Sequence, residues 1–196
     1  MMNDLKQLLG FPFEDREWIM KMMLGSVITI VPVLNFLSLG YFIRCINVGW
    51  RGRRNLPNWD SWTELFRDGL FGFLIALTYL IVPILLGFLV GMVPVVGAAL
   101  ASIIIIIMGI IIPMAIANYA MRKNIRDAFA LGEIIYKAGR VLNLYITAYL
   151  TTILIVTIGA ALLIGLPIIG FIGAVLIFYC GVVFFNLLGF LYHQAT

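Results

Sequence analysis

Two long stretches of the chain contain no charged side chain, and they limit what the chain can fold into. Residues 69–121 and 141–192 have no Asp, Glu, Lys or Arg, and each stretch is longer than fifty residues. A helix that crosses the hydrocarbon core of a bilayer needs about 20 apolar residues. Each stretch therefore has room for two membrane-spanning helices, whereas a core helix of a soluble protein would not need so long a stretch without charge.

The composition agrees with a lipid-embedded protein. Of the 196 residues, 63% are apolar and 11% are charged, whereas soluble domains contain about 45–50% apolar and about 25% charged residues. We therefore predict an all-α fold, a polytopic transmembrane helical bundle that forms a single integral membrane domain over residues 1–196. Cys45 and Cys180 lie far apart, in or beside apolar segments, so we interpret them as small core residues.

Three similar motifs lie in the middle of apolar segments. They are VPVLN (31–35), VPVVG (93–97) and LPIIG (166–170). Proline removes a backbone donor, and glycine or asparagine tolerates the left-handed conformation, so each motif suits a tight turn between two helices. The motifs predict three helical hairpins joined by two connectors. The hairpins are expected at about 18–50, 69–121 and 141–193, and the connectors at about 51–68 and 122–140.

The first hairpin has an alternative interpretation. Its uncharged part, residues 22–43, is about as long as one span, so a single crossing with the N-terminus outside also fits. The break at Pro32 and Asn35 favours two short arms, which would rise only about 21–24 Å and would thin the bilayer or form a re-entrant pair. The sequence therefore does not decide between five and six membrane segments, or on which side of the membrane the N-terminus lies.

If the three motifs are outer turns, all charged residues fall on one side of the membrane. Segments 1–21, 44–68 and 122–140 carry net charges of −1, +2 and +3, which account for the formal +4. Cytoplasmic loops carry an excess of Lys and Arg, so we expect both basic connectors and the C-terminus in the cytoplasm. The predicted location is the cell membrane, with several passes.

The polar connectors carry apolar residues at helical spacing. After Pro57, Ser61 and Glu64 have the S-x-x-E spacing of a capping box, and the helix that starts there either bends at Gly69 or continues into the second hairpin. The stretches FPFEDREWIMKM and FALGEIIYKAGRVL show the same mixture of apolar and charged residues. We predict amphipathic interfacial helices on the cytoplasmic side.

A degenerate internal repeat links the hairpins. Tyr41 and Arg44 have the same spacing as Tyr119 and Arg122, and each pair lies near the end of a predicted hairpin. Recurrence at matching places indicates repeated hairpin-and-connector units.

The stretch RGRRNLPNWDSW (51–62) could belong to a binding surface. Basic residues that directly follow a span set topology and attract anionic headgroups, and tryptophan suits the membrane interface. A nucleic-acid patch needs a folded basic surface with room for a strand, which a short connector does not supply, so we predict no nucleic-acid partner. The candidate lipid-headgroup or interface residues are Arg51, Arg53, Arg54, Trp59 and Trp62. Topology does not obviously require two tryptophans around Asp60.

Three stretches of the chain resemble a known family. They are PVLNFLSLGY (32–41), NLPNWDSWTELFRDG (55–69) and IRDAFALGEI (125–134). Together they are similar to a family of uncharacterised prokaryotic, often archaeal, polytopic membrane proteins catalogued as a domain of unknown function. The resemblance covers nearly the whole chain and implies a five- or six-segment membrane domain. It carries no activity and no catalytic residues.

No motif in the chain has the spacing of a familiar catalytic, cofactor or metal site. HExxH, paired CxxC and Walker-type motifs do not occur in the sequence. We therefore name no catalytic, cofactor-binding or metal residue and expect no cofactor. Among polar residues of the apolar segments, Asn35, Asn118 and Asn143 are candidates for hydrogen bonds between helices, and Gly87 and Gly91 form a GxxxG pair that suits close helix packing.

Two main hypotheses follow for function. The first is a non-enzymatic integral membrane protein that forms a packed bundle, as a homo-oligomer or as the membrane subunit or scaffold of a larger assembly, with the bilayer, a second copy or another membrane protein as partner. The alternative is a transporter or channel for a neutral or lipidic solute. A membrane enzyme is a third reading, and it would have to use connector carboxylates. These are Asp60, Glu64, Asp68, Asp127 and Glu133.

Overall fold

The computed structural model describes residues 10–53, 55–90, 94–165 and 170–196. Every regular element in these ranges is a helix, which confirms the all-α prediction. The elements are η1 (Phe11–Glu14), α2 (Trp18–Ile30), α3 (Asn35–Trp50), α4 (Trp62–Val90), α5 (Pro94–Arg122), η2 (Ile125–Phe129), α6 (Leu131–Arg140), α7 (Leu142–Gly165) and α8 (Gly170–Ala195).

Four helices are long and apolar enough to cross a membrane. The segments are Trp62–Phe88, Ser102–Arg122, Leu142–Gly165 and Gly170–Ala195. They belong to α4, α5, α7 and α8, so each long charge-free stretch contains two of them, as predicted from its length. Helix α2 is apolar but has only 13 residues, a rise of about 20 Å.

Helix boundaries differ from the predicted hairpin limits at the first connector. Helix α4 begins at Trp62, within the predicted connector 51–68, and runs without interruption through Gly69. Of the two alternatives for this helix, the structure adopts continuation. The apolar face that starts at Trp62 is the beginning of the span itself, because no proline or turn separates the two.

The chain breaks at the first of the three turn motifs. Helix α2 ends at Ile30 and α3 begins at Asn35, and the two helices contact each other. Helix α5 begins at Pro94, where a residue without a backbone N–H is tolerated because the first turn of a helix leaves its donors unpaired. Val93 of the second motif and residues 166–169 of the third lie outside the described residues.

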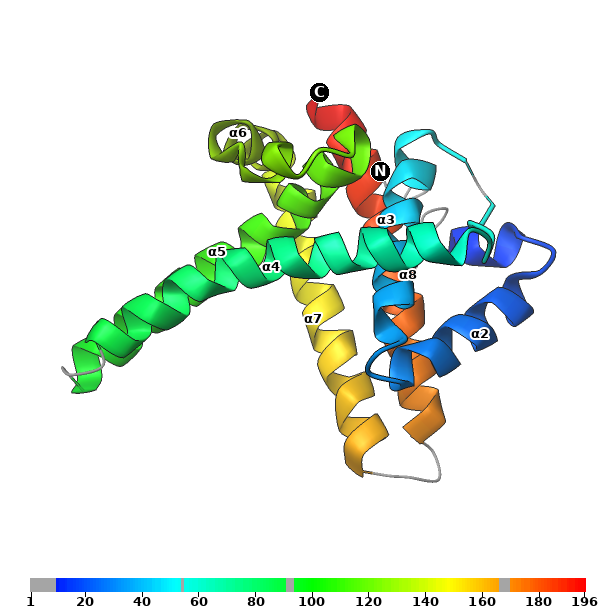
Figure 1. Ribbon diagram of the computed structural model, residues 1–196, viewed down its shortest axis with the longest axis horizontal. Coiled ribbons are helices and arrows are strands. Elements are labelled where there is room, and N and C mark those ends of the chain that lie inside the picture. Colours follow the sequence, from blue (N-terminus) through cyan, green and yellow to red (C-terminus); the bar gives the residue numbers. More distant parts are fainter. Residues whose placement is uncertain (1–9, 54, 91–93, 166–169) are drawn as a thin grey trace.

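The helices radiate from α3 (Figure 1). Helices α4 and α8 both pack on α3. From there α4 and α5 extend together as an arm beyond the other helices, whereas α7 and α8 run side by side in a different direction. The short helix α6 lies beside the C-terminal end of the chain, away from the distal ends of both pairs.

Glycines bring the backbones of α3 and α4 into contact. A Cβ added at Gly40 would lie 1.9 Å from the Leu65 carbonyl oxygen, and one added at Gly69 would lie 1.8 Å from the Phe36 carbonyl oxygen. No side chain fits at either distance, so this crossing requires glycine on both helices.

The same arrangement joins α3 to α8. A Cβ at Gly49 would lie 1.9 Å from the Asn186 carbonyl oxygen, and one at Gly189 would lie 2.0 Å from the Ile46 carbonyl oxygen. Close packing through small residues was predicted for Gly87 and Gly91. Gly87 is half-buried in α4 and Gly91 lies outside the described residues, so close packing through this pair stays a prediction.

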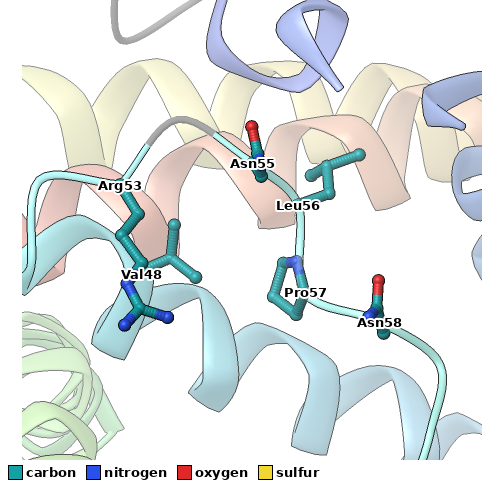
Figure 2. A pocket seen from close by; sticks show the side chains of 6 residues that line it. All are labelled: Val48, Arg53, Asn55, Leu56, Pro57 and Asn58. Carbon is teal, nitrogen blue, oxygen red and sulfur yellow. The ribbon is translucent and has the colours of Figure 1, made fainter. Parts of the chain in front are cut away.

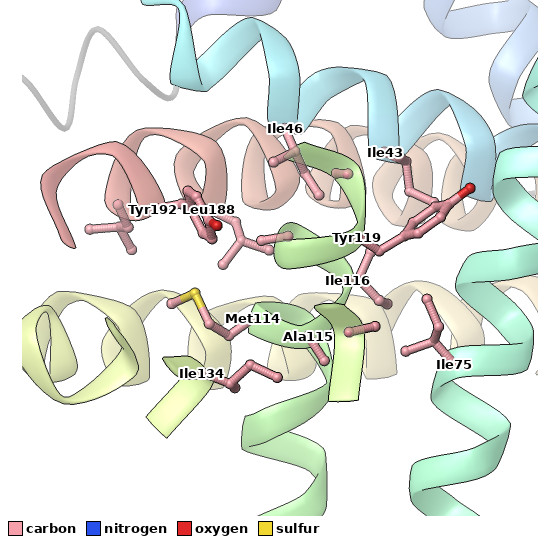
Figure 3. Packing of buried hydrophobic residues seen from close by; sticks show 14 of the residues in the cluster. Ile43, Ile46, Ile75, Met114, Ala115, Ile116, Tyr119, Ile134, Leu188 and Tyr192 are labelled. Carbon is pink, nitrogen blue, oxygen red and sulfur yellow. The ribbon is translucent and has the colours of Figure 1, made fainter. Parts of the chain in front are cut away.

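Apolar side chains from six helices meet next to these crossings (Figure 3). The cluster includes Ile43 of α3, Ile75 of α4, Met114 of α5, Ile134 of α6 and Leu188 of α8, all at most 1% exposed. Helix α7 joins it through the buried side chain of Tyr145, whose hydroxyl donates a hydrogen bond to the Ile110 carbonyl oxygen of α5. This core therefore fixes the helices near one end, and the arms project from it.

Replacing Gly69 by alanine should destabilise the fold, because a methyl group there would overlap a backbone oxygen of α3. We expect a loss of about 2 kcal/mol or more of unfolding free energy, measured by thermal unfolding of the detergent-purified protein. Gly139→Ala is the matched control, since nothing lies within 4 Å of a Cβ at this helical position. Alanine there should be neutral or stabilising by about 1 kcal/mol. Equal effects of the two substitutions would contradict the close crossing.

Candidate functional site

The described charged residues belong to three segments that contact one another. Segments 14–21, 44–68 and 122–140 are joined to each other and to the end of α8 by hydrogen bonds and ion pairs. We call these segments, with residues 192–196, the polar layer. Because the described charged side chains lie in this layer, it is the first candidate for a functional site.

Three consecutive backbone carbonyls fasten the first connector to the bundle. Each accepts a hydrogen bond from a side chain of α2 or α3. Leu56 accepts from Lys21 (3.4 Å), Pro57 from Tyr41 (2.9 Å) and Asn58 from Arg44 (3.2 Å). Since the three donors come from two helices, the loop has a defined position and is not a loose linker.

Trp59 packs inside this arrangement. Its ring stacks on Tyr41, with 4.3 Å between centroids and 15° between planes, and its centroid lies 6.0 Å from that of Phe178 in α8. Its indole N–H donates to the Lys21 carbonyl oxygen at 3.1 Å. Trp62 is exposed and stacks on the outer side at 5.8 Å. Membrane topology alone did not explain the tryptophans around Asp60. The structure explains Trp59, which joins α2, α3 and α8.

Asp15 and Lys21 form a buried ion pair. Their charged groups are 2.9 Å apart, and each residue is 8% exposed. Burial opposes ionisation of Asp15, but the hydrogen bond from Lys21 and the Glu17 amide outweigh it, so the pKa of Asp15 lies below its usual value. Sequence reasoning missed this pair, because Asp15 is one of three acidic residues in the stretch FPFEDREWIMKM, which is predicted to be interfacial, and nothing in the sequence distinguishes it.

Arg44 binds carboxylates on either side of the start of α4. Its guanidinium lies 2.5 Å from Asp60 and 3.7 Å from Glu64. Ser61 has a φ of 51°, which is left-handed and unlike the extended backbone of a usual N-cap. Among the described residues no hydrogen bond links the Ser61 hydroxyl to the first turn, so the S-x-x-E spacing produces an Arg44–Glu64 contact here in place of a capping box.

Arg122 repeats this arrangement at the second connector. Its guanidinium lies 3.7 Å from Asp127 and 2.6 Å from Glu133. In both units an arginine of the preceding helix therefore binds one carboxylate in the connector and one in the first turn of a following helix. The matched Tyr–Arg spacing that indicated a repeat corresponds to this shared contact.

Asp68 lies buried between α4 and α5. It is 4% exposed and accepts hydrogen bonds from the Tyr119 hydroxyl (3.0 Å) and the Lys123 ammonium (2.5 Å). Because a buried carboxylate without partners is costly, these bonds hold the two helices in register at the base of the arm.

Helix α6 is fastened to the C-terminal end of the chain. The buried Lys137 ammonium contacts Glu133 at 2.7 Å and the Tyr192 hydroxyl at 2.6 Å, and Arg140 donates to the Ala195 carbonyl oxygen at 3.1 Å. The hydrogen bond from Lys137, opposed by burial, holds the pKa of Glu133 below its usual value, with Arg122 adding to the effect. That α6 lies in the membrane interface stays a prediction.

The remaining candidate residues lie in different places. Arg51 and Arg53 are exposed after α3, and Arg54 lies outside the described residues. Asn35 is the first residue of α3 and Asn143 is exposed near the start of α7. Asn118 is fully buried and donates to the Asp127 carbonyl oxygen at 3.1 Å, so it bonds a connector and not another span.

Two cavities accompany these features. One, of about 390 Å³, lies between the end of α3 and the first connector (Figure 2). The other, of about 200 Å³, is an almost wholly apolar groove between α7 and α8. In the described ranges no three His, Cys, Asp or Glu side chains gather as they would around a metal ion.

Replacing Asp15 by asparagine should leave Lys21 charged and buried without its partner. At pH 7 we expect unfolding free energy to fall by about 3 kcal/mol. The lowered pKa means that the wild-type carboxylate stabilises the fold above about pH 3.9 and loses this contribution as the pH falls further. Thermal unfolding between pH 7 and pH 3 should therefore show the difference between variant and wild type shrinking at the acid end.

Asp60→Asn is the control for this measurement, because the Asp60 side chain is 66% exposed and exposed pairs contribute at most about 1 kcal/mol. A difference between Asp15→Asn and wild type that stays constant from pH 7 to pH 3 would contradict the buried ion pair.

Comparison with known proteins gives a family and no function. Residues 23–168 match a family model described as "Protein of unknown function (DUF4013)". No curated protein and no solved structure matches the chain. The match covers most of the chain and confirms the resemblance to an uncharacterised family. The chain belongs to the DUF4013 family of proteins of unknown function.

Proposed function

We propose that this chain is a multi-pass integral membrane protein of the cell membrane that acts without catalysis, as the membrane subunit or scaffold of an assembly with a second copy or another membrane protein. In this proposal the polar layer faces the cytoplasm. The observation that carries it is the contrast between the two ends of the molecule. The polar layer is bonded internally, whereas the apolar helices are left mostly uncovered.

The uncovered apolar area is too large for water. In α7 only 6% of the most apolar 18-residue stretch is buried. Phe88 and Ile164, near the distal ends of α4 and α7, are each 83% exposed. Removing apolar area from water gains about 25 cal/mol per Å², and soluble monomers rarely expose large contiguous apolar patches. A lipid environment removes this cost for both pairs of helices.

The lengths of the helices agree with their divergence. Helices α4 and α5 each have 29 residues, a rise of about 44 Å, against a hydrocarbon core of about 30 Å. A span longer than the core is accommodated by tilting. The surplus length therefore allows the arm and the α7–α8 pair to cross the same bilayer while pointing in different directions.

The connector carboxylates are engaged in structural contacts, which favours a scaffold over an enzyme. Each forms an ion pair with arginine or lysine within the polar layer. Asp60 and Glu64 pair with Arg44, Asp68 with Lys123, Asp127 with Arg122, and Glu133 with both Arg122 and Lys137. A general acid or base would need access to a substrate. Asp68 is only 4% exposed, and the exposed Asp60 and Glu64 are both paired with Arg44 at the start of α4.

The transporter alternative would need Asn118 and Asn143 to line a common pathway, but the two residues lie in different parts of the structure. Asn118 is buried and bonded to a connector carbonyl, whereas Asn143 is exposed on α7. Neither lines the cavity at the first connector or the groove between α7 and α8. Helices with open apolar faces instead suit association by close packing, as in a subunit of a larger assembly.

Cysteine labelling tests the membrane orientation. Gly139→Cys places a thiol in the polar layer and Gly165→Cys places one at the distal end of α7, and nothing lies within 4 Å of a Cβ at either position. A membrane-impermeant maleimide should label Gly165→Cys on intact cells and Gly139→Cys only in inverted vesicles. Cys45 and Cys180 are buried, so the wild type should give little background. Labelling of both variants from the same side would overturn the proposed orientation.

Native mass spectrometry tests the proposed assembly. Protein extracted with its surrounding lipid should be detected as a homo-oligomer or together with another membrane protein, because the outward apolar face of α7 is open to packing by another chain. A lone monomer that turns over a substrate robustly would contradict the scaffold role.

A further inference from the structure

The cavity at the end of α3 has a lining suited to an anion (Figure 2). It measures about 390 Å³ and is lined by Val48, Arg53, Asn55, Leu56, Pro57 and Asn58. Among the described residues of the lining, Arg53 is the one cation, Asn55 and Asn58 supply two carboxamides, and there is no carboxylate. The Arg53 guanidinium forms no ion pair or hydrogen bond within the described residues, unlike Arg44 and Arg122, whose charges are used inside the polar layer.

The way α3 ends places Arg53 in this lining. Gly52 has a φ of 61° and its N–H donates to the Gly49 carbonyl oxygen at 3.1 Å, while the Arg53 N–H donates to the Val48 carbonyl oxygen at 3.1 Å. These two bonds make a Schellman motif, in which the chain reverses after a left-handed glycine. Arg53 is therefore folded back over Val48, whereas Arg51 still belongs to the helix end and does not line the cavity.

The opposite wall is preformed. The carbonyls of Leu56, Pro57 and Asn58 point to side chains of the bundle and accept their hydrogen bonds. The backbone N–H groups of Asn55 and Asn58 donate to no acceptor in the described part of the chain. A site whose loop is already ordered loses less conformational entropy when it binds a ligand.

The hydrogen-bond donors of this lining suit a phosphate group. A guanidinium presents a planar fork that matches phosphate oxygens, and the carboxamides supply further N–H donors. The apolar side chains of Val48, Leu56 and Pro57 form the rest of the lining and suit the glycerol and the first carbons of an acyl chain. Anionic phospholipids are enriched at the cytoplasmic surface, where the proposed function places the polar layer.

We propose that the cavity between the end of α3, Arg53 and residues 55–58 binds the phosphate group of an anionic phospholipid, with Arg53 as its charged contact. The inference rests on the proposed membrane location and orientation, and it goes beyond general attraction of basic connectors to the membrane. General attraction would depend equally on Arg51 and Arg53, which are two residues apart. A site requires Arg53 alone.

Lipid titration distinguishes these two cases. Wild-type protein in neutral detergent is titrated with short-chain phosphatidylglycerol, and binding is measured by calorimetry. Arg53→Gln should weaken binding at least about tenfold, as expected when a charge-assisted contact is lost. Arg51→Gln should weaken it less than about twofold. Equal losses for the two variants, or no loss for Arg53→Gln, would overturn the site.

Further arms identify the ligand. Arg53→Lys should give an intermediate affinity, because it keeps the charge and loses the fork. Short-chain phosphatidylcholine should bind weakly, and inorganic phosphate should not compete at equal concentration. Full competition by inorganic phosphate would show a soluble phosphate as the occupant and overturn the lipid assignment. Gly139→Cys and Gly165→Cys, made in the Arg53→Gln background, should keep their labelling pattern, so loss of the lipid site and failure of the proposed orientation give different results.

Discussion

The structure depends on direct backbone contact of α3 with the helices on either side of it. In lipid there is no hydrophobic force that drives helices together, so they associate through close packing and hydrogen bonds. Gly40 and Gly69 allow this contact with α4, and Gly49 and Gly189 allow it with α8. Helix α3 has 16 residues, a rise of about 24 Å, so it serves as a short central post from which longer helices extend.

The polar layer is built on the ends of the same helices. Charged groups at a membrane interface are stable when buried only if each is paired and hydrogen-bonded. The chain meets this condition by returning each connector to the helix that precedes it. Arg44 and Arg122 each hold the connector that follows them, and Lys21 and Tyr41 hold the loop that carries Trp59. One end of the molecule is thereby rigid, while the apolar arms depend on lipid or on a partner for cover.

The contrast between the polar layer and the apolar helices agrees with the two proposed roles. A scaffold needs a fixed end and surfaces that are free to pack, and these are the polar layer and the outward faces of α4, α5 and α7. The proposed phosphate site lies in the fixed end, where the Schellman turn at Gly52 and three anchored carbonyls hold its lining. A lipid bound there would link the rigid layer to the composition of the surrounding membrane.

The sequence alone predicted the helical class and the two long apolar helices in each charge-free stretch, because charge-free length and turn chemistry are local properties that need no knowledge of the fold. It also indicated the Tyr–Arg repeat, since equal spacing is visible without coordinates. It left open whether the helix that starts after Pro57 bends at Gly69 or continues, because glycine is compatible with both.

Only the tertiary structure decided which residues of the connectors are buried. Asp15 pairs with Lys21, Asp68 with Lys123, and the indole of Trp59 with the Lys21 carbonyl, over separations of 6, 55 and 38 residues. Most of these contacts are distant in sequence and involve residue types that are equally common on solvated surfaces. The sequence likewise does not distinguish Gly40 and Gly69 from the other glycines of the chain, because which glycine meets a backbone depends on where two helices cross.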